Sequence, residues 1–192
     1  MSKTVLFWRR TDLEGLERLE LVVGPDGVAV QSAVISLEDG ALRIDHRWQL
    51  DADWRVQSVL VERWNARDHQ TVRLERSAAG WRVDGSSRPD LDGAVEPDLS
   101  VTPFCNTIAI RRLWRTQAPS LTLDVAYING STLEVARSSQ RYERRAPDRV
   151  RYVDLGLSRG FEADLMVDEM GLVLDYEHLF ERVTRERASE PG

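Results

Sequence analysis

The sequence is poor in cysteine, in lysine and in long hydrophobic runs. Cys105 is the single cysteine among 192 residues, which excludes an internal disulfide and any metal site built from several cysteines. No apolar stretch approaches the roughly 20 residues that a membrane-spanning helix requires. The apolar stretch from Thr4 to Trp8 is short and is followed by two arginines, unlike a secretory signal. We therefore expect a cytoplasmic protein with no transmembrane segment.

Positive charge comes almost entirely from arginine, because Lys3 is the only lysine. The formal net charge is -6, and arginines alternate with aspartates and glutamates along the chain. This distribution lacks the one-sided basic surface that binds a phosphate backbone, so nucleic acid is not an expected partner. Glycine-rich phosphate loops are also missing, and His46, His69 and His178 stand in no metal-ligand spacing. We expect no metal and no other cofactor.

Alternation of apolar and polar residues, the pattern of a half-buried strand, recurs almost from end to end. In residues 41–50, for example, Leu42, Ile44 and Trp48 share one face and charged residues share the other. Short turn signals such as Gly24-Pro25-Asp26-Gly27 separate these runs, so consecutive strands should be antiparallel. We predict a mainly β protein with a single curved antiparallel sheet of about ten strands, enough to form a barrel or half-barrel.

Residues 86–120 interrupt the alternation. Within them Thr102-Pro103 is typical of a helix start, because threonine caps exposed amides and proline suits the first helical turn. We predict a short helix from about Pro103 to Trp114 that covers the open side of the sheet. A second short helical segment is predicted at residues 177–185. The chain is expected to form one β-rich domain over residues 1–187, followed by a frayed tail at residues 188–192.

Two motifs that suggest chemistry are better explained as turns. The segment Gly156–Gly160 matches a hydrolase nucleophile elbow, but that motif requires a helix after the serine, whereas residues 161–167 alternate as a strand. The segment Asp90–Gly93 resembles part of a calcium loop, yet Arg88 and Leu99 stand at two of its ligand positions. The lone Cys105 is typical of a small packed residue rather than a nucleophile.

Several polar residues fall in phase with apolar faces. His46 shares the face of Leu42 and Trp48, Ser58 and Glu62 share the face of Trp54 and Leu60, and Arg137 shares the face of Leu133 and Val135. Burying an unpartnered polar group costs a few kcal/mol. These residues should therefore pair with one another, as Glu62 with Arg137, lie at strand ends, or line a wet cavity with mostly apolar walls.

Two long segments resemble the signature regions of the bacterial putative glycolipid-binding family. The first runs from Leu91-Asp92-Gly93 through Asp98-Leu99-Ser100-Val101-Thr102-Pro103-Phe104-Cys105-Asn106 to Leu113, and the second is Val167-Asp168-Glu169-Met170-Gly171 through Tyr176 to Phe180. The resemblance implies a curved antiparallel sheet around an apolar cavity, similar in fold to the carriers of outer-membrane lipoproteins. It also implies that the chain binds a ligand.

The first segment contains five residues that suit a ligand: Asp92, Asp98, Asn106, Arg111 and Arg112. An arginine fork recognises phosphate or carboxylate, and an amide or a carboxylate bridges sugar hydroxyls. The structural alternative is that Asp92 or Asp98 pairs with one of the arginines and fastens the helix to the sheet.

The leading hypothesis is a binding protein for a glycolipid or another amphiphilic, acyl-bearing ligand. An apolar cavity covered by residues 102–113 would hold the chain of the ligand, with its head group near Arg111 or Arg112. One alternative is an enzyme for a hydrophobic or sugar-bearing substrate, with Asp98, His46 or Glu62 as acid or base. The other is a solid structural or interaction module whose six tryptophans fill the interior. The oligomeric state and the ligand's identity stay open at this point.

Overall fold

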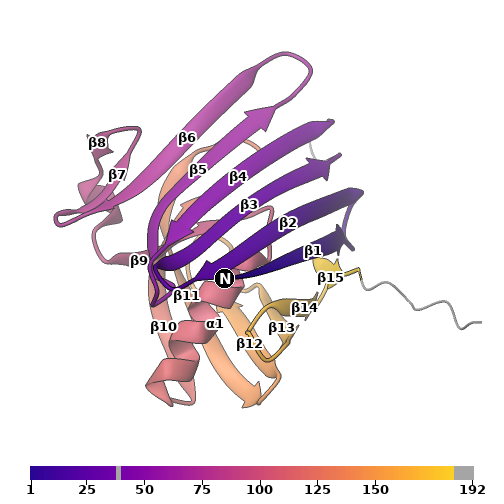
Figure 1. The fold of residues 1–192 in the computed structure, drawn as a ribbon, viewed down its shortest axis with the longest axis vertical. Coiled ribbons are helices and arrows are strands. Elements are labelled where there is room, and N and C mark those ends of the chain that lie inside the picture. The colour runs from indigo at the N-terminus through magenta and orange to yellow at the C-terminus, as the bar shows by residue number, and fades with distance from the viewer. Residues whose placement is uncertain (38–39, 184–192) are drawn as a thin grey trace, which may run out of the picture.

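One large sheet makes up most of the molecule in the computed structural model, which describes residues 1–37 and 40–183 (Figure 1). The first half of the chain forms a meander: β1 (Ser2–Arg10), β2 (Gly15–Gly24), β3 (Gly27–Ser36), β4 (Leu42–Leu50), β5 (Val56–Trp64), β6 (His69–Ser77), β7 (Gly80–Val83) and β8 (Ser86–Ser87). The second half contains the 3-10 helix η1 (Pro89–Leu91), β9 (Ala94–Leu99), α1 (Phe104–Thr116), β10 (Ser120–Ile128), β11 (Val135–Ala146), β12 (Arg149–Asp154), β13 (Glu162–Val167), β14 (Val173–Tyr176) and β15 (Phe180–Arg182).

The strand order is β8-β7-β6-β5-β4-β3-β2-β1-β15-β14-β13-β12-β11-β10-β9. Strand β1 lies between β2 and β15, so the two halves of the chain join into one curved surface (Figure 1). The sheet does not close into a barrel. Where β9 approaches β5 and β7, side chains make the connection: the amide of Val56 donates to Glu96, and the Trp81 indole N–H donates to the carbonyl of Ala94.

The predicted mainly β class and single curved sheet are confirmed, but the strand number is wrong. The described residues form 15 strands rather than about ten. Several are only two to four residues long, such as β7, β8 and β15, and alternation cannot be recognised over so short a run. The sheet is also not wholly antiparallel. Strands β9 and β10 are parallel, because α1 connects them as a crossover.

The first predicted helix is confirmed as α1, which begins one residue later than expected and extends two residues further, to Thr116. Pro103, rather than the predicted Thr102, stands at the cap position, and the hydroxyl of Thr102 accepts a hydrogen bond from the amide of Phe104, the first helical residue, at 3.2 Å. The second predicted helix is wrong. The described residues up to 183 form a tight turn and β15, and His178 in that turn has a φ of 70°, which no α-helix accommodates. The predicted frayed tail lies outside the described residues.

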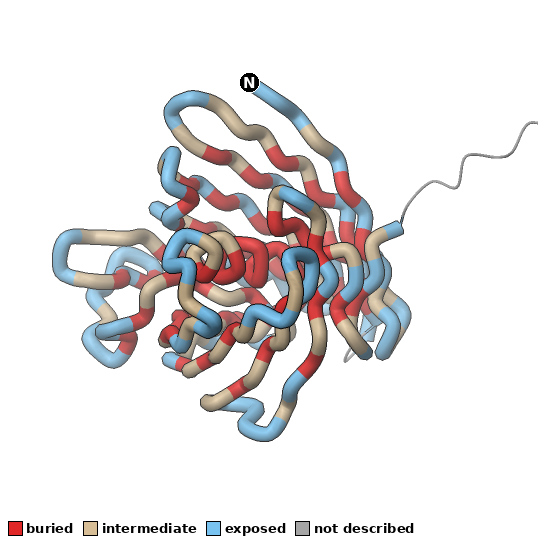
Figure 2. Tube along the Cα trace, turned by 90° about the horizontal axis from the view of Figure 1, so that it is seen from below, coloured by how far each residue is buried: buried red, intermediate tan, exposed pale blue. Residues whose placement is uncertain are grey.

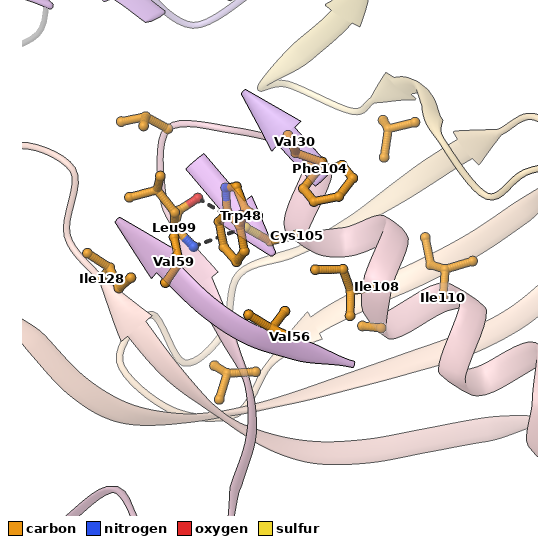
Figure 3. Close-up of a cluster of buried hydrophobic side chains, with 14 of the residues drawn as sticks. Val30, Trp48, Val56, Val59, Leu99, Phe104, Cys105, Ile108, Ile110 and Ile128 are labelled. Atoms are coloured by element: carbon orange, nitrogen blue, oxygen red, sulfur yellow. Dashed lines mark hydrogen bonds between the residues drawn. The ribbon is translucent and has the colours of Figure 1, made fainter. Parts of the chain in front are cut away.

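The helix fills the concave side of the sheet rather than only covering its opening. Phe104, Ile108 and Ile110 of α1 are buried among the inward side chains of the strands (Figure 3). The ring of Phe104 meets that of Trp48 edge-on, with centroids 5.9 Å apart. Buried segments alternate with exposed ones along the strands around this centre (Figure 2). Because each such apolar side chain contributes roughly 1.5–3 kcal/mol when buried, α1 is a major part of the core. Within residues 1–37 and 40–183, no helix is long and apolar enough to cross a bilayer.

Candidate functional site

A pocket of about 270 Å³ lies where the N-terminal end of α1 meets strands β12 to β15. Five aromatic side chains form much of its wall: Tyr127, Tyr152, Phe161, Tyr176 and Phe180. Its polar lining consists of Asp98, Ser100, Thr102, Asn106, Asp154 and Ser158. We call it the aromatic pocket. Apolar walls with a few convergent polar groups are typical of small-molecule sites, whose volumes are roughly 300–1,000 Å³. The volume of the aromatic pocket lies just below that range.

Four of these rings form a continuous cluster, because β12, β14, β15 and the residue before β13 bring Tyr152, Tyr176, Phe180 and Phe161 together. Tyr152 on β12 lies 6.0 Å from Tyr176 on β14, and Tyr176 lies 6.2 Å from Phe180 on β15, measured between ring centroids. Phe161 is 6.0 Å from Tyr152. These ring pairs are tilted, an arrangement that aromatic quadrupoles favour over face-to-face stacking. The result is a preformed apolar wall.

Asp98 extends from β9 into this pocket and has an unusual protonation behaviour. Burial raises the pKa of its carboxyl to about 6, and the nearby charge of Asp154 adds to the increase. The amide of Gln140 donates to Oδ2 of Asp98 at 2.5 Å and opposes that effect only in part. Asp98 therefore exchanges its proton near neutral pH, which is uncommon for an aspartate.

The carboxylate of Asp154 accepts hydrogen bonds from the backbone of the loop that borders the pocket. Its Oδ1 accepts from the amides of Gly156 at 2.8 Å and Ser158 at 3.0 Å, and its Oδ2 accepts from the hydroxyl of Tyr152 at 3.0 Å. These bonds explain the elbow-like segment Gly156–Gly160. It is a turn leading into β13, as interpreted from the sequence, and Ser158 is presented at the pocket wall by a capped loop rather than by a helix.

Asn106 lies on the first turn of α1 and joins the pocket to a buried polar layer. The hydroxyl of Tyr142 is 3.0 Å from Oδ1 of Asn106 and 3.1 Å from Oε1 of Gln140, and it donates to one of these oxygens at a time. Burial raises the pKa of Tyr142 well above its usual value, so the hydroxyl stays protonated as a donor. This layer orients Gln140 toward Asp98.

His46 points into the interior, as predicted, but its partners are protein groups. The indole N–H of Trp48 donates to Nδ1 of His46 at 2.8 Å, so the ring proton resides on Nε2 and is directed at Oε1 of Glu17, 3.1 Å away. Ser32 and Thr102 also donate to that oxygen, at 2.6 and 2.9 Å. Thr102 lines the aromatic pocket, so its hydroxyl links the pocket wall to the buried Glu17.

Glu62 and Arg137 face outward, contrary to the prediction from phase, and they do not pair. Glu62 is bonded to Arg47 at 2.7 Å, and Arg137 is bonded to Asp124. For Glu62 the reason is a bulge: the pairing of β4 with β5 shifts between Gln49 and Leu50, which moves the inward phase of β5 by one residue. Alternation counted across the bulge therefore assigns the wrong face.

For Arg137 the cause lies outside the strand. Leu133 precedes β11 and has a φ of 59°, so the apparent alternation from Leu133 to Arg137 runs through a turn.

Asp92 is exposed at the end of η1 and does not line the aromatic pocket. The segment around Asp90 and Asp92 forms η1 and the turn that follows, as predicted from the sequence. The carboxylate of Asp90 accepts two hydrogen bonds from the guanidinium group of Arg88.

Arg111 and Arg112 lie at the other end of α1, around a second pocket of about 180 Å³. Arg112 donates to Oε1 of Glu96 at 2.9 Å. The guanidinium of Arg111 lies over the ring of Trp54, 4.0 Å from its centroid, and donates to the carbonyl of Met170 at 2.8 Å.

The eight residues predicted to bind a ligand are therefore not brought together at one site. Asp98 and Asn106 line the aromatic pocket, and Arg111 and Arg112 line the second pocket. His46 is buried in the interior. The remaining three lie outside both pockets: Asp92, Glu62 and Arg137.

The sequence prediction missed the aromatic wall. All four tyrosines of the chain, Tyr127, Tyr142, Tyr152 and Tyr176, belong to this pocket or to the polar layer behind it. The available signal was their confinement to the second half of the chain, since the six tryptophans are concentrated in the first. Among the described residues, no group of three or more histidine, cysteine or acidic side chains is placed to hold a metal ion.

The open curved sheet, the helix in its concavity and the small aromatic pocket together define a class of β-rich protein with a preformed ligand-sized site. A model of the family described as "Putative glycolipid-binding" matches residues 5–182. The chain belongs to that family.

A solved structure supports the same assignment. The crystal structure of a DUF1089 family protein from Pseudomonas aeruginosa is similar, with a TM-score of 0.76 and 30% sequence identity, covering 87% of this chain and 92% of that one. No curated protein matches the chain.

Proposed function

We propose that the aromatic pocket binds the uncharged sugar head of a glycolipid or a similar amphiphile. The observation that carries this proposal is the lining itself: five aromatic rings beside two carboxyl groups, and no arginine or lysine among the residues of the pocket. Carboxyl and amide oxygens accept bonds from sugar hydroxyls, and apolar rings pack against the C–H face of a sugar. Two carboxyl groups disfavour an anionic head. The family's description agrees with such a ligand.

The volume of the pocket limits how much of the ligand is enclosed. At about 270 Å³ the pocket suits a single ring or a short chain segment. The concavity where an acyl chain was expected is occupied by buried side chains of α1, among them Phe104 and Ile110. The proposal therefore places the head group inside and the rest of the amphiphile at the mouth, away from the Arg111 and Arg112 originally expected to hold the head.

The test is a calorimetric titration of the full chain with a neutral alkyl glycoside below its micellar concentration, with an alkyl sulfate of equal chain length as the anionic comparison. Phe161→Ala removes part of the aromatic wall and should weaken glycoside binding about two- to tenfold, since an aromatic contact contributes roughly 0.5–1.5 kcal/mol. Phe7→Ala is the matched control, because Phe7 is exposed on the outer face. Equal affinities of wild type and Phe161→Ala, or no glycoside binding at all, would contradict the proposal.

A second candidate function is acid–base catalysis on a sugar-bearing substrate. The supporting observation is a carboxyl whose pKa is raised to about 6, that of Asp98, in the same pocket as the hydrogen-bonded carboxylate of Asp154. Two carboxyl groups with different environments are typical of glycoside hydrolysis, in which the protonated one acts as general acid. Hydrolysis of aryl glycosides by the wild type, lost in Asp98→Asn with binding retained, would establish this function. Glycoside binding without turnover would leave the binding role alone.

A further inference from the structure

The second pocket, at the C-terminal half of α1, contains an excess of positive charge that ion pairs do not account for. Four arginines line it, Arg55, Arg111, Arg112 and Arg115, against two carboxylates, Asp53 and Glu96. We call it the arginine pocket. The whole chain is acidic, with a formal net charge of -6, so this concentration of guanidinium groups is local.

The carboxylates present are already shared or distant. Glu96 is bonded to Arg112 at 2.9 Å and to Arg76 at 3.0 Å, and it also accepts the amide of Val56. The single negative charge of Glu96 is therefore paired with two guanidinium groups. Asp53 is 3.9 Å from Arg115, and both side chains are largely exposed, so that contact contributes little.

Two of the arginines have no carboxylate partner among residues 1–37 and 40–183. Arg55 makes no side-chain bond with any of these residues. Arg111 donates one N–H to Met170, but its Nε is buried and unpartnered. Burial lowers the pKa of Arg111, and the charge of Arg115 adds to that effect. The charge of Arg111 is therefore not neutralised by a carboxylate within the described part of the chain.

Ordinary structural roles explain only part of this cluster. Arg115 is in the last turn of α1, where a cation is stabilised by the helix dipole. Arg112 holds Glu96. Neither explanation applies to Arg55, which comes from the loop between β4 and β5 and is brought to the helix by the fold. The volume of about 180 Å³ equals that of about six waters at roughly 30 Å³ each, enough for a tetrahedral oxyanion with some hydration.

We propose that the arginine pocket binds a phosphate group, held by the guanidinium groups of Arg55, Arg111 and Arg115 that line it. Guanidinium forks match phosphate oxygens in geometry and charge. The phosphate is either free in solution or part of a lipid or other phosphomonoester, because guanidinium groups recognise the phosphate oxygens in each case. This site is separate from the aromatic pocket and lies at the opposite end of α1.

The experiment is a calorimetric titration of the full chain with inorganic phosphate at low ionic strength, against sodium chloride of the same ionic strength. Arg55→Gln is the decisive variant, since Arg55 has no partner whose loss would disturb folding. We expect it to weaken phosphate binding about tenfold, and Arg67→Gln, an exposed arginine outside the pocket, to have no effect. Phe161→Ala should also leave phosphate binding unchanged, which separates this site from the proposed sugar site.

Vesicles distinguish the two sources of phosphate. Sedimentation with phosphatidylcholine vesicles containing phosphatidic acid, lost in Arg55→Gln and reversed by free phosphate, identifies a lipid phosphate. Saturable binding of inorganic phosphate without sedimentation identifies a soluble one. The proposal is overturned if phosphate produces no saturable heat beyond that of chloride, or if wild type and Arg55→Gln bind it equally well.

Discussion

The raised pKa of Asp98 makes a quantitative prediction about stability and pH. An aspartate has a pKa of 3.8 when unperturbed and the buried Asp98 has a pKa of about 6, a difference of about two units. One unit corresponds to about 1.4 kcal/mol, so ionising Asp98 in the folded state costs about 3 kcal/mol relative to the unfolded chain. Between these two values the folded protein binds more protons than the unfolded one.

The sign of the effect follows from that difference in protonation. The contribution of Asp98 is fully present below about pH 4 and is lost as the pH rises through about 6. The free energy of unfolding of the wild type should therefore fall by about 3 kcal/mol over this range on account of this group. Asp98→Asn removes the ionisable group and should remove its contribution to the dependence of the unfolding free energy on pH. The loss of the hydrogen bond from Gln140 to the carboxylate lowers the stability of this variant at every pH.

The assay is urea denaturation of both proteins from pH 4.5 to pH 8, with the difference in unfolding free energy plotted against pH. Other titrating groups contribute to both curves and cancel in the difference. Asp90→Asn provides a control without a slope, because the ion pair with Arg88 lowers the pKa of Asp90, so its stabilisation is lost only below about pH 4, outside the assayed range. A difference between wild type and Asp98→Asn that does not vary with pH would refute the assigned environment of Asp98.

Two further substitutions test the scaffold around the pocket. Glu17→Ala leaves the donors of His46, Ser32 and Thr102 without their common acceptor and should cost about 3–5 kcal/mol in urea denaturation. Glu20→Ala on the outer face should change stability little, because its ion pair with Lys3 is exposed to solvent. Similar losses for both variants would contradict the buried network. Gly156→Ala places a Cβ 2.3 Å from Oγ of Ser138 and 2.6 Å from a backbone nitrogen, so the loop beside the aromatic pocket must shift and glycoside affinity should fall by more than tenfold in calorimetry. Gly160→Ala meets nothing within 4 Å and strains only its own φ of 100°, so unchanged pocket binding is expected for it.

The sequence was sufficient wherever the signal was local. Alternation with a period of two predicted the strands and their inward residues, among them Ile44, His46 and Trp48, because each position depends only on its own pleat. The Thr102-Pro103 start predicted α1 for the same reason, since a cap acts within one turn. The membership in the family also follows from contiguous segments of sequence.

Only the tertiary structure decided where the polar residues meet. The bulge between β4 and β5 turned Glu62 outward, although every residue nearby kept its chemistry. Asp98 and Asp154 are separated by 56 positions in the chain and share one pocket because β9 and β12 belong to the same curved sheet. The pKa of Asp98 and the charge around Arg55 arise from desolvation and from neighbours contributed by distant strands, and these are properties of the packed molecule rather than of any segment.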